Sequence, residues 1–114
     1  MTKVIFYTSI RGENFVQKFI DGLEEVTQSK ILRIVMAIQT YGLQAILPHV
    51  KKLSGTPLWE IRILGKDNIR IFYIVHHLDT VILLHGFIKK KQKTDFREID
   101  IAVRRYEEIK NLVS

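Results

Sequence analysis

Residues 58–88 read LWEIRILGKDNIRIFYIVHHLDTVILLHGFI, and the fold class follows from the elements that these residues predict. The stretch holds three apolar runs rich in β-branched and aromatic side chains: residues 58–64, 68–75 and 80–88. Such runs are typical of β-strands. The connections between them, residues 65–67 and 76–79, are short enough to join neighbouring antiparallel strands. The stretch therefore predicts a three-stranded β-meander.

Two helical patterns precede the meander. Residues 13–24 and 27–41 each repeat apolar side chains every three or four positions, which predicts two amphipathic helices. We expect the second helix to begin with Thr27 or Ser29 as its N-cap and to stop at Gly42, because glycine is favoured just beyond a helix C-terminus. The two helices should form a hairpin.

The ends of the chain complete the pattern. A short apolar run at residues 3–7 predicts a first strand, and residues 95–113 return to the helical period. The order of elements is then βααβββα. We predict an α+β domain in which a helical hairpin packs on a small antiparallel sheet and a C-terminal helix follows. The helices should cover one face of the sheet and leave the other open.

Length and composition limit the class of protein. A chain of 114 residues fits a single domain, residues 1–114, with one hydrophobic core. The absence of cysteine excludes disulfides and thiolate metal sites. No stretch approaches the roughly 20 apolar residues that span a bilayer. We therefore expect a cytoplasmic protein that does not insert into a membrane.

Positive charge is concentrated between residues 48 and 93. This segment carries nine Lys or Arg against three Asp or Glu, which equals the net charge of +6 of the whole chain. A localised excess on a predicted sheet is suited to an anionic partner, and the polyphosphate backbone of a nucleic acid is the obvious candidate.

Alternation along the strands separates the two faces of the sheet. Trp59 should point toward the helices, together with the other odd-numbered apolar residues of its run, and Arg62 should point away. On the open face we expect Arg70 beside Phe72, with His85 on the neighbouring strand. Cations mixed with an exposed ring are typical of a surface where a nucleic acid or a protein helix docks.

Four motifs then occur in order along the chain. They are Leu58–Arg62, Ile69–Tyr73, Leu84–Lys90, and Lys93-Thr94 leading into a helix with Arg104 and Arg105. In this order they resemble the toxins of the RelE/ParE superfamily, and the nearest branch is the phage-derived, HigB-like toxins. One departure is Asp95, where this branch commonly has proline. Thr94 is still expected to cap the last helix.

The resemblance implies a RelE-like fold and a toxin of a type II toxin–antitoxin system. Such toxins are usually ribosome-dependent mRNA endonucleases that inhibit translation, so the implied partners are mRNA on the ribosome and a helix-turn-helix antitoxin in a hetero-oligomeric complex. Two alternatives stay open. One is a ParE-like toxin that acts on a protein target such as gyrase, and the other is an inactive, basic phage remnant that binds nucleic acid.

Metal-independent cleavage of RNA sets the chemistry that the site must supply. The 2′-hydroxyl attacks the adjacent phosphate, so the protein needs a base, an acid and cations around the developing phosphorane. No metal or cofactor is expected. Arg62 and Arg70 suit phosphate clamping because a guanidinium binds two oxygens and stays charged. Lys89 and Lys90 should neutralise the scissile phosphate, with a merely solvated lysine loop as the alternative.

The remaining candidate residues each have alternative roles. His85 is a candidate acid or base because imidazole titrates near neutral pH; the alternative is a partly buried histidine that satisfies a backbone carbonyl. For stacking on a base the resemblance favours Tyr73, whereas alternation places Phe72 beside Arg70, and the two rings face opposite sides. The RNA-binding surface is expected to extend over Lys51, Lys52, Lys91 and Lys93, with ordinary solvent-exposed lysines as the alternative.

Overall fold

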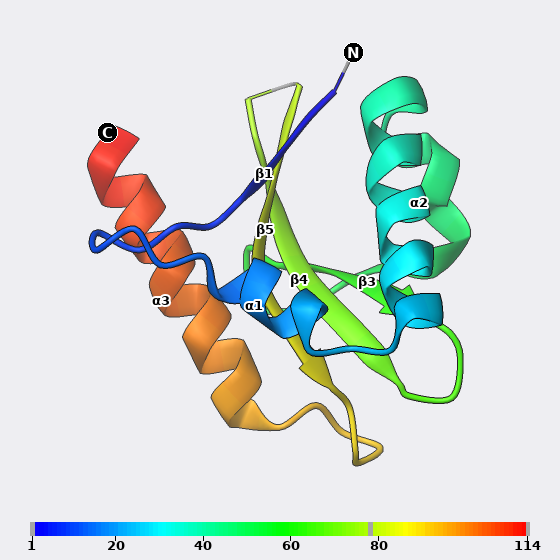
Figure 1. Cartoon of the computed structure of the whole chain (residues 1–114). Helices are drawn as coiled ribbons and strands as arrows, with labels where there is room; N and C mark the ends of the chain where they lie inside the picture. The colour runs from blue at the N-terminus through cyan, green and yellow to red at the C-terminus, as the bar shows by residue number, and fades with distance from the viewer. Residues whose placement is uncertain (1, 78, 114) are drawn as a thin grey trace.

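The computed structural model describes residues 2–77 and 79–113 (Figure 1). The α+β class, with a helical hairpin, a meander and a C-terminal helix, is confirmed. Leu78, in the predicted connection 76–79, lies outside the described residues. In chain order the elements are β1 (Lys3–Phe6), α1 (Phe15–Asp21), α2 (Glu25–Tyr41), the 3-10 helix η1 (Leu43–His49), β2 (Val50–Lys52), β3 (Trp59–Ile63), β4 (Ile69–His76), β5 (Thr80–Ile88) and α3 (Phe96–Val113).

The strands form one sheet in the order β1-β5-β4-β3-β2. β3, β4 and β5 are consecutive antiparallel neighbours, which confirms the meander. β1 pairs with β5 in parallel, with Val4 opposite Val81, so the sheet is mixed rather than wholly antiparallel. At the other edge, β2 arises from residues for which no element was predicted; its three residues are too few for a strand period to be recognised.

Helices cover both faces of the sheet. In Figure 1, α2 and α3 lie on opposite sides of β4 and β5. One core lies under the hairpin and includes Ile31, Ile38 and Ile61, and the second includes Phe72 and packs against α3. The prediction of helices on one face and an open second face is therefore wrong. The reason is that nearly every residue of β4 is buried, so the strand has two apolar faces and each of them needs a cover.

Local signals set the helix ends. Asn14 caps α1, since its side chain accepts a hydrogen bond from the Gln17 N–H at 3.0 Å. α2 ends at Gly42, whose φ of 85° favours glycine, and this confirms the predicted stop. The predicted start of α2 at Thr27 or Ser29 is wrong, because the helix already begins at Glu25. Among the residues described, no helix is both long and apolar enough to cross a membrane.

A close contact fixes the hairpin on β5. The ring of Phe19 lies against the backbone of Gly86, and a Cβ at position 86 would come within 2.6 Å of the ring atom Cδ2 of Phe19. Real Cβ atoms essentially never approach that closely. Glycine at position 86 is therefore required by the packing of α1 on this strand.

An ion pair is buried in the middle of the sheet. Arg70 Nε lies 3.1 Å from Glu60 Oε1, and the two side chains are only 10% and 6% exposed. The Nε–H is not aligned for a hydrogen bond, but Arg70 Nη1 donates to the carbonyl of Ile69 at 3.1 Å. Each charge is therefore compensated chiefly by the other.

Breaking this pair should be costly. We expect Glu60→Gln to lower the free energy of unfolding by about 3 kcal/mol, because Arg70 would be left as an uncompensated buried charge. Replacing both residues by apolar ones, Glu60→Leu with Arg70→Met, should recover most of the loss. Urea denaturation followed by circular dichroism measures both. Asp100→Asn is the matched control, since its ion pair with Arg104 is exposed and should cost less than about 1 kcal/mol. Equal losses for Glu60→Gln and Asp100→Asn would contradict the role of burial.

Filling the space at Gly86 should also destabilise the chain. We expect Gly86→Ala to cost about 1–3 kcal/mol of unfolding free energy through overpacking against Phe19. In a double-mutant cycle, Phe19→Leu should relieve part of this cost and give a coupling of at least about 0.5 kcal/mol. Gly22→Ala is the control, because a Cβ there meets neighbours only at ordinary distances of 3.6 Å or more. If the losses of unfolding free energy for Gly86→Ala and Phe19→Leu were additive, contact with the Phe19 ring would not be the reason that glycine is required at position 86.

Candidate active site

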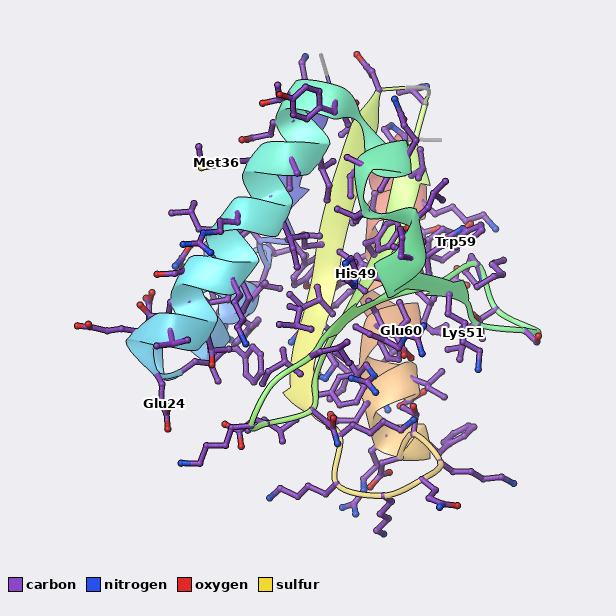
Figure 2. All side chains as sticks on the ribbon, turned by 90° about the vertical axis from the view of Figure 1, so that its right-hand side faces the viewer. Glu24, Met36, His49, Lys51, Trp59 and Glu60 are labelled. Carbon is purple, nitrogen blue, oxygen red and sulfur yellow. The ribbon has the colours of Figure 1, made fainter. Side chains whose placement is uncertain are left out.

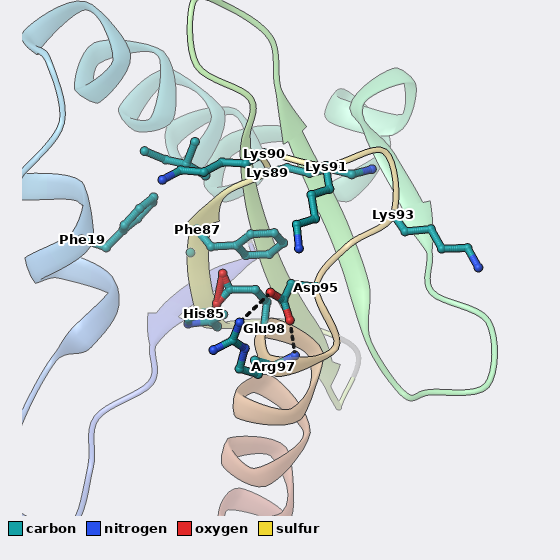
Figure 3. Close-up of a pocket in the computed structure, with 12 residues that line it drawn as sticks. Phe19, His85, Phe87, Lys89, Lys90, Lys91, Lys93, Asp95, Arg97 and Glu98 are labelled. Atoms are coloured by element: carbon teal, nitrogen blue, oxygen red, sulfur yellow. Dashed lines mark hydrogen bonds and ion pairs between the residues drawn. The ribbon is translucent and has the colours of Figure 1, made fainter.

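A basic pocket opens where β5 ends and α3 begins (Figure 3). It has a volume of about 560 Å³, within the range of small-molecule sites. Phe19 of α1 and Phe87 of β5 supply aromatic walls, and Lys89 is held in place by its backbone N–H, which donates to the Asn68 carbonyl at 2.7 Å. Five cationic residues line the pocket: Lys89, Lys90, Lys91, Lys93 and Arg97. The structure thus brings the four predicted lysines after β5 together in one place.

The first turn of α3 closes one side of the pocket. Asp95 caps this helix, since its Oδ1 accepts a hydrogen bond from the backbone N–H of Arg97 at 2.9 Å. This bond holds the pKa of the Asp95 carboxyl below its usual value. The cap was expected at Thr94, so the residue that replaces the usual proline takes over the capping role itself.

His85 forms a pair with Glu98 at the inner end of the pocket. Its Nε2 lies 2.9 Å from Glu98 Oε1, and the two side chains are 13% and 26% exposed. The imidazole also stacks on the ring of Phe87, with 5.6 Å between the centroids. Burial lowers the pKa of His85; Glu98 opposes this shift and Arg105 adds to it. The predicted acid–base candidate is therefore largely buried, and a carboxylate bonds it on the pocket side.

Arg105 approaches His85 from the next turns of α3. Its Nη1 donates to the Leu84 carbonyl at 2.7 Å and lies 3.4 Å from His85 Nδ1. The guanidinium sits near the rings of Tyr7 and Phe15, at 5.0 Å and 4.8 Å from their centroids. Burial lowers the pKa of Arg105, but an arginine stays charged in proteins. A fixed positive charge therefore faces one nitrogen of the imidazole.

The two predicted phosphate clamps differ in their surroundings. Arg62 and Arg70 are opposite each other on β3 and β4, and Phe87 is the next residue in this row on β5. The charge of Arg70 is taken up by Glu60 inside the fold, so a clamping role would require this pair to break. Arg62 is half-buried, and within residues 2–77 and 79–113 no carboxylate forms an ion pair with it. Arg62 is therefore the better placed of the two to take an anion.

Neither candidate for base stacking lies at the surface. Tyr73 is 2% exposed in the core under the hairpin, and burial raises its pKa to about 12. Phe72 is fully buried in the core against α3. The rings do face opposite sides, as alternation predicted, but the stacking role expected for Tyr73 is not compatible with its burial.

Lys51 and Lys52 lie away from the pocket. They belong to the edge strand β2, which is separated from β5 by β3 and β4, and Figure 2 shows Lys51 near Trp59 at this edge. The ammonium of Lys52 lies 5.6 Å from the centroid of the Trp59 ring. These lysines form a separate basic edge and are not part of the pocket.

Sequence reasoning missed the residues that α3 contributes. Glu98 was not among the predicted site residues, and Arg105 was identified only as part of a motif. A signal was present: positions 98, 102 and 105 follow the i, i+4, i+7 spacing of one helix face, and Ala102 on that face is fully buried. Phe96, which lies between Asp95 and Arg97, is 77% exposed.

Comparison with known proteins gives the family. The model of the family described as Phage derived protein Gp49-like (DUF891) matches residues 18–107, from within α1 to the last turns of α3. No curated protein matches the chain. The matched region contains β5, the basic pocket and the residues of α3 that face His85. The chain therefore belongs to the phage-derived Gp49-like family, which is associated with RelE-like toxins.

Proposed function

We propose that this protein is a toxin of a type II toxin–antitoxin system that cleaves mRNA on the ribosome. The observation that carries the proposal is the pocket itself, because five cationic residues line the same pocket as a histidine–carboxylate pair. Cations bind phosphate, and a titratable pair can move protons. Membership of a family associated with RelE-like toxins supports the toxin part of the proposal.

The reaction proposed is transphosphorylation within the RNA chain. The 2′-hydroxyl loses its proton and its oxygen bonds to the adjacent phosphorus, while the bond from phosphorus to the 5′ oxygen of the next nucleotide breaks. The 5′ oxygen leaves as a hydroxyl after taking up a proton. Lysine ammonium groups of the pocket would stabilise the extra negative charge of the phosphorane. The nucleophile belongs to the substrate, so the protein supplies positioning, charge and proton transfer.

Arg62 extends the site along the sheet. It shares a row with Phe87, which lines the pocket, and it has a positive charge without a carboxylate partner among the described residues. A neighbouring phosphate of a bound RNA strand would supply the missing negative charge. Arg70 has a structural role in this proposal, because it holds Glu60 within the sheet.

An antitoxin is the second partner that we propose. A cationic pocket bordered by the exposed ring of Phe96 suits a segment with acidic and apolar residues. Such a segment on a helix-turn-helix antitoxin would compete with RNA for the pocket in a toxin–antitoxin complex. Inhibition would then fall as salt screens the contact.

Loss of one pocket lysine should weaken RNA binding in a salt-dependent way. For Lys89→Gln we expect the slope of log K against log salt to decrease in magnitude by about 0.7, as expected for one lost phosphate contact with a single strand. The ligand is a single-stranded 2′-O-methyl RNA, which lacks the nucleophile and stays intact. Fluorescence anisotropy between 50 and about 200 mM salt gives the slope. Lys110→Gln, at the far end of α3, is the matched control and should leave it unchanged. Equal slopes for both variants would contradict phosphate binding in the pocket.

Induction of the protein in bacteria tests the class of target. We expect growth arrest and new transcript ends within coding sequences that are being translated, because the proposed substrate is mRNA on the ribosome. Sequencing of transcript 5′ ends before and after induction measures this. Growth arrest with intact transcripts and damaged DNA would instead support a ParE-like action on gyrase, and unimpaired growth would support an inactive binding protein.

A further inference from the structure

We infer that Glu98, not His85, accepts the proton of the 2′-hydroxyl of bound RNA, and that Arg105 positions Glu98 by fixing the tautomer of His85. This inference rests on the proposed function for the reaction, but its structural part can be tested without RNA. It assigns roles to two residues of α3 that the sequence motifs left without one.

Both nitrogens of the imidazole are already engaged. Nε2 lies 2.9 Å from Glu98 Oε1, and Nδ1 lies 3.4 Å from Arg105 Nη1. Arginine has N–H donors and no acceptor, so an Nδ1 that faces it must offer its lone pair. The proton of the neutral ring then sits on Nε2 and is donated to Glu98. In this state His85 has no free nitrogen to take a proton from a substrate.

The position of Arg105 is fixed, so its guanidinium can determine the tautomer of His85. Its Nη1 also donates to the Leu84 carbonyl at 2.7 Å, next to His85 in the same strand. The rings of Tyr7 and Phe15 lie within 5.0 Å of the guanidinium and limit its movement. A second proton on His85 would place an Nδ1–H against this fixed positive charge, and burial disfavours the charged ring as well.

Glu98 has the better access to the pocket. Its side chain is twice as exposed as that of His85, at 26% against 13%, and both residues line the pocket. The N–H of His85 bonds Oε1 and so fixes the orientation of the carboxylate. Oε2 has no hydrogen bond with any residue that the structure describes. In the reaction, Oε2 would accept the proton of the 2′-hydroxyl as its oxygen bonds to phosphorus, and the departing 5′ oxygen would take a proton from water.

Conservative variants separate a positioning histidine from one that moves protons. We expect Glu98→Gln to lower the rate of RNA cleavage by about 100-fold or more, since the amide keeps the shape but is not a base. His85→Gln should stay within about tenfold of the wild type, because its amide N–H can still donate to Glu98, whereas His85→Ala should lose about 100-fold. Cleavage of ribosome-bound mRNA under single-turnover conditions measures all three. Equal losses for His85→Gln and His85→Ala, or a Glu98→Gln variant close to the wild type, would overturn the inference.

The tautomer itself can be read from nitrogen NMR spectra of the free protein. We expect the proton of neutral His85 on Nε2 in the wild type and a mixture of tautomers in Arg105→Met. Arg104→Met is the matched control, because Arg104 is the exposed neighbour that pairs with Asp100, and it should leave the spectrum of His85 unchanged. Thermal unfolding of each variant shows that the fold is kept. An Nδ1–H tautomer in the wild type would overturn the role of Arg105. Absence of RNA cleavage by the wild type would overturn only the proposed function.

Discussion

The candidate site depends on the packing of α3 against β5. Ala102 is fully buried at this contact, and a side chain of that size lets the helix lie close to the strand. Glu98 precedes it by about one turn and Arg105 follows by about one turn, on the same face of the helix. Glu98 therefore contacts Nε2 of His85 and Arg105 contacts Nδ1, one from each side of Ala102 along the helix. A shift of α3 along the strand would separate all three groups together.

Burial on both faces of the sheet explains why some cationic residues are paired inside the fold and others are left for a ligand. α3 covers part of the second face, and on that face Arg70 is buried with Glu60 as its counterion. Next to the N-terminal turn of this helix lies the pocket, where the cations of the 89–97 segment have no carboxylate partner within residues 2–77 and 79–113 apart from the Asp95–Arg97 contact. Positive charge that appeared as one patch in the sequence is thus partly structural and partly available to a ligand.

Much of the fold follows from local patterns, because alternation, helical period and the terminal glycine of α2 each act over a few residues. The parallel pairing of β1 with β5 joins segments nearly 80 positions apart, and no local pattern encodes it. The same limit applies to the site. The lysines after β5 are adjacent in the chain and were found together. The burial of Tyr73, in contrast, depends on where the hairpin packs, and the contacts of Glu98 with His85 depend on where α3 packs. Strand alternation alone could not show that a helix would cover the second face.

If the pocket promotes attack by the 2′-hydroxyl of RNA, the chemical ends of the cleaved strands will show it. Purified protein incubated with ribosomes and an end-labelled mRNA yields fragments whose termini can be identified by enzymatic labelling and mass spectrometry. We expect a 2′,3′-cyclic phosphate or a 3′-phosphate on one fragment and a 5′-hydroxyl on the other. Fragments with 5′-phosphate and 3′-hydroxyl ends would contradict this expectation, because attack by an external water would then have cut the chain.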